Sequence, residues 1–158
     1  MTRPCDLDAV DARKLIGNKK LSPLELTKSC IEQIEKLNPS INAVVAIDDA
    51  DVLKQAKKAE DEVMTGSELG LLHGLPVGIK DLNIVKNLRS TSGSKIYENR
   101  IPESDDTIVE DIRSEGAIIF CKTNTPEFGA GGNTKNFVYG ATSNPFDITK
   151  TPAGSSGG

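Results

Sequence analysis

Lys80 is the residue of this 158-residue chain whose surroundings most favour catalytic chemistry. It follows the apolar run "LPVGI" and precedes Asp81, and few polar residues upstream would keep the segment at the protein surface. A lysine held out of water favours its neutral amine, because burial destabilises the charged ammonium form. A neutral amine at this place could act as a general base. The ordinary alternative is a strand lysine whose charged end group stays in water.

Three other sets of residues could support chemistry, but each lacks the companions that its chemistry needs. His73 is the only histidine, and no neighbouring signature suggests a Ser-His-Asp relay, so a structural histidine is expected. The run "FGAGGNT" (128–134) has glycines that could surround a phosphate, but Thr134 occupies the place of the third glycine of G-x-G-x-x-G. "SGSK" (92–95) matches the S-x-x-K of serine β-lactamases, whose partner motifs S-D-N and K-T-G are missing.

The run "TPAGSSGG", Thr151 to Gly158, has two interpretations. A Gly/Ser segment of this kind often serves as a flexible linker. However, the chain is already rich in Gly, Asn, Thr, Ser and Pro from Phe128 onward, and a long loop-dense stretch inside a compact domain is often functional. The residues alone therefore leave open whether the run is a linker or part of an active-site loop.

The helix with the clearest sequence signals begins at Ser22. Ser22 and Glu25 form a capping box, and Pro23 occupies the first helical position, where its missing N–H costs nothing. An apolar stripe follows at helical spacing, and Asn38-Pro39 is predicted to end the helix. Apolar periodicity and glycine stops predict three more elements before residue 67: a helix over 7–17, a strand over 42–47 and a charged amphipathic helix over 48–66.

The second half of the chain changes character and predicts a β-sheet. Residues 75–85 are expected to form a strand, and residues 103–116 a helix capped by Ser104 or Asp105. The apolar run at 117–122 is typical of a buried strand. A helix followed directly by a buried strand indicates an α/β sheet with at least partly parallel strands.

Composition excludes several classes of partner and site. Lys and Arg total 19 against 23 Asp and Glu, for a net charge of −4, and aromatic residues are only 4%. With no basic face and no stacking platform, nucleic acid is not expected as a direct ligand. Cys5, Cys30 and Cys121 are widely spaced, which makes a zinc or disulfide framework a poor interpretation. No stretch approaches the length of a membrane span, so a cytoplasmic, soluble protein without membrane partners is expected.

Three segments in order resemble the successive blocks of the amidase signature family: "GLPVGIKD", "GAIIFCKTNTPEFG" and "NPFDITKTPAGSSGG". The similarity spans most of residues 71–158. It implies an α/β fold with a mixed β-sheet core flanked by helices and an N-terminal helical layer. Residues 1–158 are expected to be a single incomplete amidase-signature domain, present only as an N-terminal fragment. Its parts would be a helical region over 1–66 and the start of the α/β catalytic core over 67–158.

The resemblance implies a Ser–cis-Ser–Lys triad that needs no cofactor or metal. Lys80 matches the catalytic lysine, and Ser155 matches the bridging serine, entered through a cis peptide from Gly154. The nucleophile of the family is a further serine beyond Gly158, so the 158 residues alone are expected to be inactive. Ala153 stands where the family usually has glycine, which puts the local loop geometry in question. The sequence identifies no substrate-binding residue.

Two neighbours of these residues have expected secondary roles. Ser156 could support Ser155 by hydrogen bonding. Asp81 is expected to point away from Lys80, because an ionised carboxylate close by would hold the lysine in its charged form.

Three functions are compatible with the resemblance. The first is an amidase that converts a small-molecule carboxylic amide into an acid and an amine, with a homodimer among its allowed assemblies. The second is the A subunit of glutamyl-tRNA amidotransferase, a glutaminase that works with partner subunits. The loop "NTPEFGAGGNT" resembles free-standing amidases more than that glutaminase, whose usual run is closer to "NMDEFAMGSST". The third is a non-catalytic binding module on the same scaffold.

Overall fold

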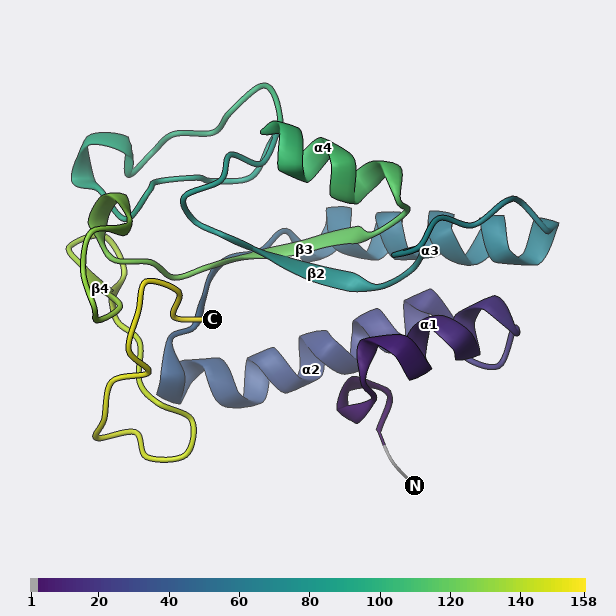
Figure 1. Cartoon of the computed structure of the whole chain (residues 1–158), viewed down its shortest axis with the longest axis horizontal. Coiled ribbons are helices and arrows are strands. Elements are labelled where there is room, and N and C mark those ends of the chain that lie inside the picture. Colours follow the sequence, from purple (N-terminus) through teal and green to yellow (C-terminus); the bar gives the residue numbers. More distant parts are fainter. Residues whose placement is uncertain (1–2) are drawn as a thin grey trace.

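A computed structural model describes residues 3–158. Its centre is a mixed three-stranded β-sheet in the order β1-β3-β2 (Figure 1). The strands are β1 (Val44–Ala46), β2 (Pro76–Lys80) and β3 (Ile118–Thr123). β3 runs parallel to β2 and antiparallel to β1, as the helix-then-strand pattern predicted in part. Register pairs Lys80 with Thr123, so the end of β2 lies beside the end of β3.

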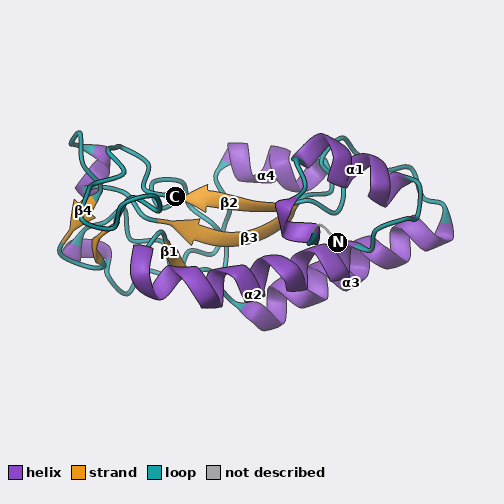
Figure 2. Ribbon diagram, turned by 90° about the horizontal axis from the view of Figure 1, so that it is seen from below, coloured by secondary structure: helices purple, strands orange, loops and turns teal. Residues whose placement is uncertain are grey.

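Four α-helices surround this sheet (Figures 1 and 2). They are α1 (Ala9–Gly17), α2 (Pro23–Ile41), α3 (Asp49–Thr65) and α4 (Thr107–Ser114). The side chains of successive β3 residues point to opposite faces of the sheet, as expected of an extended strand. Ile118 and Phe120 pack with α2 and α3, whereas Ile119 packs with Val109 of α4. None of the helices in residues 3–158 is long and apolar enough to cross a membrane.

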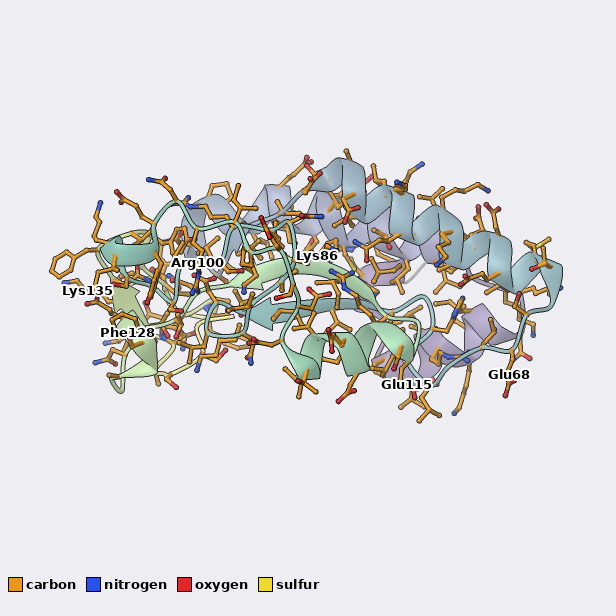
Figure 3. All side chains as sticks on the ribbon, turned by 90° about the horizontal axis from the view of Figure 1, so that it is seen from above. Glu68, Lys86, Arg100, Glu115, Phe128 and Lys135 are labelled. Carbon is orange, nitrogen blue, oxygen red and sulfur yellow. The ribbon has the colours of Figure 1, made fainter. Side chains whose placement is uncertain are left out.

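The remaining short elements lie in the loops. They are the 3₁₀ turns η1 (Pro4–Asp6), η2 (Lys95–Tyr97) and η3 (Glu127–Gly129), and the strands β4 (Lys135–Asn136) and β5 (Gly140–Ala141). β4 and β5 pair as a small antiparallel hairpin. Phe128 and Lys135 mark this loop-rich end of the molecule, opposite to Glu68 at the other end (Figure 3).

The second helix starts as predicted but ends later. The hydroxyl of Ser22 accepts hydrogen bonds from the N–H groups of Leu24 and Glu25. Pro39 lies inside the last turn, and the helix continues to Ile41. Proline removes one backbone donor and strains the preceding turn, but near a helix end the remaining N–H groups can still be bonded. The end is set by Asn42, which adopts the left-handed conformation with φ of 52°.

Two further boundaries differ from the prediction. β2 ends at Lys80 rather than continuing to residue 85, because the chain turns there and Asn83 N–H donates to the carbonyl of Lys80 at 3.0 Å. α4 begins after Asp106, and neither Ser104 nor Asp105 caps it. Asp105 instead accepts from the N–H of Lys86 and from Arg113, so its carboxylate ties the preceding loop to the helix.

Candidate active site

Lys80 and Ser155 meet at the end of the sheet. Lys80 is the last residue of β2, and its Nζ lies 2.8 Å from the Oγ of Ser155. The C-terminal segment returns to the tip of the β2 arrow, which brings residues far apart in sequence side by side (Figure 2). The peptide bond between Gly154 and Ser155 is cis, as the resemblance implies. A half-buried amine and a hydroxyl in direct contact are the arrangement that proton transfer between them requires.

Backbone contacts hold the segment around Ser155 in place. The N–H and hydroxyl of Thr134 both donate to the carbonyl of Ala153 at 3.0 Å. On the other side of the serine, Gly157 N–H donates to the carbonyl of Asn124 at 3.0 Å. Ser155 is therefore anchored both before and after its own position. The run at 151–158 is not a free linker in this structure.

A buried amide network supports these anchors. Asn124 directly follows β3 and is fully buried, and Asn136 is almost fully buried. The side-chain amide of Asn136 donates to Asn124 Oδ1 and to the carbonyl of Thr125, both at 2.8 Å. Asn124 in turn donates to Thr142 Oγ1 at 2.9 Å. The sequence analysis did not predict this network. Its only trace in the sequence is a run of polar residues after the buried strand at 117–122, and such a run is equally typical of an exposed loop.

Tight packing explains the glycine that follows the two serines. A Cβ added to Gly157 would lie 2.4 Å from Cγ2 of Thr134, which is too close for any side chain. Ala153, where the related family usually has glycine, has a φ of 69°. The left-handed region costs a residue with a Cβ about 1–2 kcal/mol relative to glycine. The loop therefore keeps the backbone conformation of a glycine position while carrying an alanine.

A fully buried ion pair lies beneath this site. Lys122 of β3 and Asp81 both have 0% exposure, and their Nζ and Oδ1 atoms are 3.4 Å apart. Asp81 also accepts from the N–H and the hydroxyl of Thr91. As expected, its carboxylate contacts Thr91 and Lys122 rather than Lys80. Lys122 was not among the predicted site residues, because a lysine at the end of an apolar strand gives no signal of burial by itself.

The other motifs from the sequence do not join the site. His73 is buried, and its Nε2 lies 3.0 Å from the carbonyl of Ala59, so it has the expected structural role. In the S-x-x-K match, Lys95 pairs with Glu98 and Ser92 contacts Arg100, so its serine and lysine have separate partners. The support expected from Ser156 is also wrong. Its hydroxyl instead donates to the carbonyl of Gly158 at 3.2 Å.

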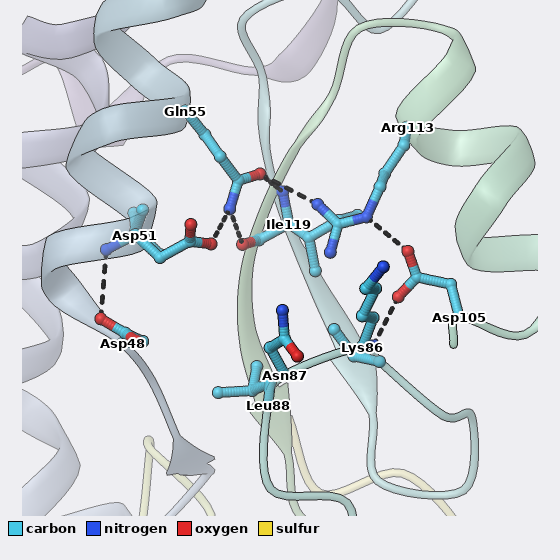
Figure 4. Close-up of a pocket in the computed structure, with 11 residues that line it drawn as sticks. Asp48, Asp51, Gln55, Lys86, Asn87, Leu88, Asp105, Arg113 and Ile119 are labelled. Atoms are coloured by element: carbon cyan, nitrogen blue, oxygen red, sulfur yellow. Dashed lines mark hydrogen bonds and ion pairs between the residues drawn. The ribbon is translucent and has the colours of Figure 1, made fainter. Parts of the chain in front are cut away.

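A separate hollow of about 470 Å³ lies between α3, α4 and the loop at 85–88 (Figure 4). The amide of Gln55 accepts from the N–H of Ile119 at 3.1 Å and donates to its carbonyl at 3.4 Å, which satisfies an unpaired stretch of β3. Arg113 links Gln55 to Asp105. Lys80 and Ser155 do not line this hollow. Its hydrogen bonds join α3 to β3 and α4 to α3.

The described residues contain no cluster of three or more His, Cys, Asp or Glu side chains that could hold a metal ion. Burial raises the pKa of the Cys30 thiol to about 11 and that of the Cys121 thiol to about 12. Both side chains therefore stay protonated near neutral pH and behave as apolar residues, whereas metal ligation requires the thiolate.

Known proteins resemble this chain over a range that includes Lys80 and Ser155. The family model described as Amidase matches residues 25–158. The A subunit of glutamyl-tRNA(Gln) amidotransferase from Acaryochloris marina is 40% identical over 140 residues, which cover 89% of this chain and 29% of that protein. A solved bacterial aryl acylamidase of the amidase signature family is 31% identical with a TM-score of 0.88, over 96% of this chain and 32% of the other. Fatty acid amide hydrolase is 26% identical with a TM-score of 0.91, over 98% of this chain and 27% of the other.

These matches bear on fold and on length. The expected fold class, helices around a mixed sheet as in amidase-signature enzymes, is confirmed by TM-scores of 0.88 and 0.91. The chain spans about a third of the length of the curated relatives that it matches, at 29–31% of each.

Proposed function

Because the chain belongs to the amidase signature family, we propose that it supplies Lys80 and Ser155 to an enzyme that hydrolyses a carboxylic amide to an acid and an amine. The observation that carries this proposal is the 2.8 Å contact between Lys80 Nζ and Ser155 Oγ. It joins the two residues that the family resemblance selects independently of the structure.

The proposed chemistry is a proton relay that ends at a serine nucleophile. Neutral Lys80 accepts the proton of the Ser155 hydroxyl, and Ser155 accepts the proton of the nucleophilic serine. That serine attacks the amide carbonyl and forms an acyl-enzyme, while the proton returns along the relay to the leaving amine. Water then hydrolyses the acyl-enzyme and releases the acid. No step requires a metal or a cofactor.

We place the nucleophile outside residues 1–158. Neither serine of the pair at 155–156 matches the nucleophile of the related family. In addition, Ser155 is occupied by its contact with Lys80, and the hydroxyl of Ser156 is directed to Gly158. On this proposal the 158 residues hold two of the three triad members and do not turn over an amide by themselves.

A second candidate function is supported by the curated relatives. Relatives between 36% and 40% identical are described as the A subunit of glutamyl-tRNA(Gln) amidotransferase. In that case the amide is glutamine, the amine is ammonia, and the chain acts inside a complex with partner subunits. The loop at 124–134 favours the free-standing amidase instead, since it differs from the usual run of that glutaminase. We keep the amidase as the first proposal.

The test uses a longer polypeptide, in which residues 1–158 are followed by a segment that corresponds to the two thirds of the relatives that this chain does not cover. It is incubated with aliphatic, aromatic and glutamine amides, and release of both acid and amine is measured. Hydrolysis of a simple amide without partners supports the first proposal. Hydrolysis of glutamine only, and only with partner subunits, supports the second. A folded polypeptide that binds amides but hydrolyses none would contradict both and favour a non-catalytic binding module.

A further inference from the structure

The hydrogen-bond partners of Lys122 and Asp81 are those of a charged ammonium group and a charged carboxylate. Three acceptors surround the Nζ of Lys122: the carbonyl of Asn83, the Oγ of Ser90 at 3.2 Å and the Oδ1 of Asp81 at 3.4 Å. The hydroxyl of Ser90 already donates its hydrogen to the carbonyl of Leu88, so it can only accept from Lys122. An amine with three acceptors and no donor around it is an ammonium group.

Asp81 has the complementary arrangement. Its Oδ2 accepts from the hydroxyl of Thr91 at 2.6 Å, and both of its oxygens lie 3.1 Å from the N–H of Thr91. With Lys122 as its third partner, the side chain contacts donors only, as an ionised carboxylate does. Both groups have 0% exposure, so solvent does little to weaken their fields.

The ion pair adjoins the backbone at Lys80, although the carboxylate itself contacts Thr91 and Lys122. Asp81 follows Lys80 directly, and Lys122 pairs in register with Ile79, so the ion pair adjoins the end of β2 from the face that carries α4. Lys80 itself forms no ion pair with any group in residues 3–158, and its Nζ contacts the hydroxyl of Ser155. An unpaired carboxylate at position 81 would therefore be an uncompensated buried charge one residue from Lys80 in the chain.

Other charged or titratable groups face the pair from the elements around it. Arg100 donates to the carbonyl of Ser90, and Asp106 accepts from the N–H of Ile84, so both bind the backbone of the loop that covers the pair. Tyr139 approaches from the β4–β5 hairpin, and burial raises its pKa, which leaves the phenol neutral. Burial lowers the pKa of Lys122, and the charge of Asp81 opposes that effect. Arg89 lies over the ring of Tyr139, with its Cζ 5.0 Å from the ring centre.

We propose that Lys122 is a positioning residue of the amidase site, which binds and neutralises Asp81 so that this carboxylate does not hold the neighbouring Lys80 in its ammonium form. The inference rests on the proposed function, because it concerns the supply of a neutral amine at Lys80. It also gives Asp81 a definite role. Through Thr91 the carboxylate fixes the loop after β2, and through Lys122 its charge is compensated inside the protein.

The test measures the protonation of Lys80 directly. The longer polypeptide is labelled with ¹³C-lysine, and the pH midpoint of the Lys80 side-chain signal is followed by NMR, with Lys80→Arg used for assignment. Lys122→Met leaves Asp81 uncompensated and should move the Lys80 midpoint upward by about one pH unit, the lower end of the shift of about 1–3 units that a neighbouring opposite charge causes. Lys58→Met is the matched control, since Lys58 is an exposed α3 lysine paired with Glu62.

Two further variants keep the test decisive if Lys122→Met does not fold. Asp81→Asn removes the negative charge and should lower the Lys80 midpoint, and the double variant Lys122→Met/Asp81→Asn should return it to the wild-type value. A reciprocal pattern of this kind is not expected if the pair has only a packing role. An unchanged Lys80 midpoint in the folded variants would overturn the proposal.

The activity of the longer polypeptide separates this inference from the proposed function. If Lys80 is the base, the acidic limb of its kcat/KM profile should follow the Lys80 midpoint in Lys122→Met, with about a tenfold loss near neutral pH if the midpoint rises by about one pH unit. If the midpoint moves but Lys80→Ala retains full activity, the compensation of Asp81 stands and the catalytic role of Lys80 fails. If Lys80→Ala is inactive and the midpoint never moves, the catalytic role stands and this inference fails.

Discussion

Lys80 Nζ and Ser155 Oγ lie 2.8 Å apart although 75 residues separate them in the chain. The two side chains come from different kinds of structure: a strand end within the sheet and a loop that depends on tertiary contacts. The contact therefore depends on the residues that hold the loop around Ser155 in place. The role of each of these residues can be tested by a separate measurement.

Asn136 is expected to hold the loops around Ser155 in place. Asn136→Ala removes two donated hydrogen bonds and leaves the N–H groups of Val138 and Tyr139 without their side-chain acceptor. We expect a loss of about 1–3 kcal/mol in the free energy of unfolding, measured by urea denaturation. Asn144→Ala is the matched control, because the Asn144 side chain accepts only from the exposed N–H of Phe146. Equal losses in the two variants would contradict the role assigned to Asn136.

Gly157 should tolerate no side chain. Gly157→Ala drives a Cβ to within 2.4 Å of Thr134, whose hydroxyl and N–H hold Ala153. Overpacking of this kind costs about 1–3 kcal/mol, and the displaced loop should also lower the kcat of the longer polypeptide. Gly132→Ala is the control, because a Cβ there meets nothing within 4 Å. A crystal structure of Gly157→Ala with an unchanged Lys80–Ser155 distance would show that the packing argument is wrong.

Cys121, which is buried, and Cys30, which is half-buried, should resist alkylation in the folded protein. The pKa of Cys30 is raised to about 11 and that of Cys121 to about 12, in both cases mainly by burial. A raised pKa keeps the thiol protonated below that pH, so the reactive thiolate is scarce at pH 8 and increases as the pH rises. Iodoacetamide followed by peptide mass spectrometry at pH 8 should label both residues only after unfolding. Rapid labelling of Cys121 in the native state would contradict its assigned burial.

The helical layer should contribute stability without shaping the site. Ile16 of α1 is fully buried against Leu26 and Leu75, whereas Val10 on the same helix is 62% exposed. Ile16→Ala should cost about 2–5 kcal/mol, and Val10→Ala should change little, as measured by urea denaturation. Below the unfolding transition, Ile16→Ala should retain the kcat/KM of the longer polypeptide. A specific loss of kcat in the folded state would show that α1 is coupled to the Lys80–Ser155 contact.

Much of the fold could be predicted from local signals. The cap at Ser22 and the glycine stop at Gly66 are local backbone chemistry, and the structure confirms both. The predicted helix boundaries were wrong where contacts with residues distant in sequence determine the start or end of a helix. Asp105 gives a plausible cap in sequence, but its carboxylate is used by Lys86 and Arg113. Pro39 resembles a helix end, but Asn42 sets that end, with its side chain bonded to the carbonyl of Tyr139.

The site was only partly accessible from the sequence. Lys80 stood out by its apolar surroundings, and Ser155 only through the family resemblance. Lys122 and Asn136 gave no distinct signal, because their importance comes from burial and from partners in other segments of the chain. A lysine that follows apolar residues has the same sequence pattern whether its amine reaches water or a buried carboxylate.

The most direct test of the proposed relay is amide hydrolysis by single alanine variants of the longer polypeptide. Lys80→Ala and Ser155→Ala should each lower kcat/KM by about three orders of magnitude, as expected for loss of a proton relay. Ser156→Ala is the matched control and should stay within about tenfold of wild type, since its hydroxyl contacts only Gly158. Near wild-type turnover by folded Lys80→Ala or Ser155→Ala would contradict the proposal that their contact carries the reaction.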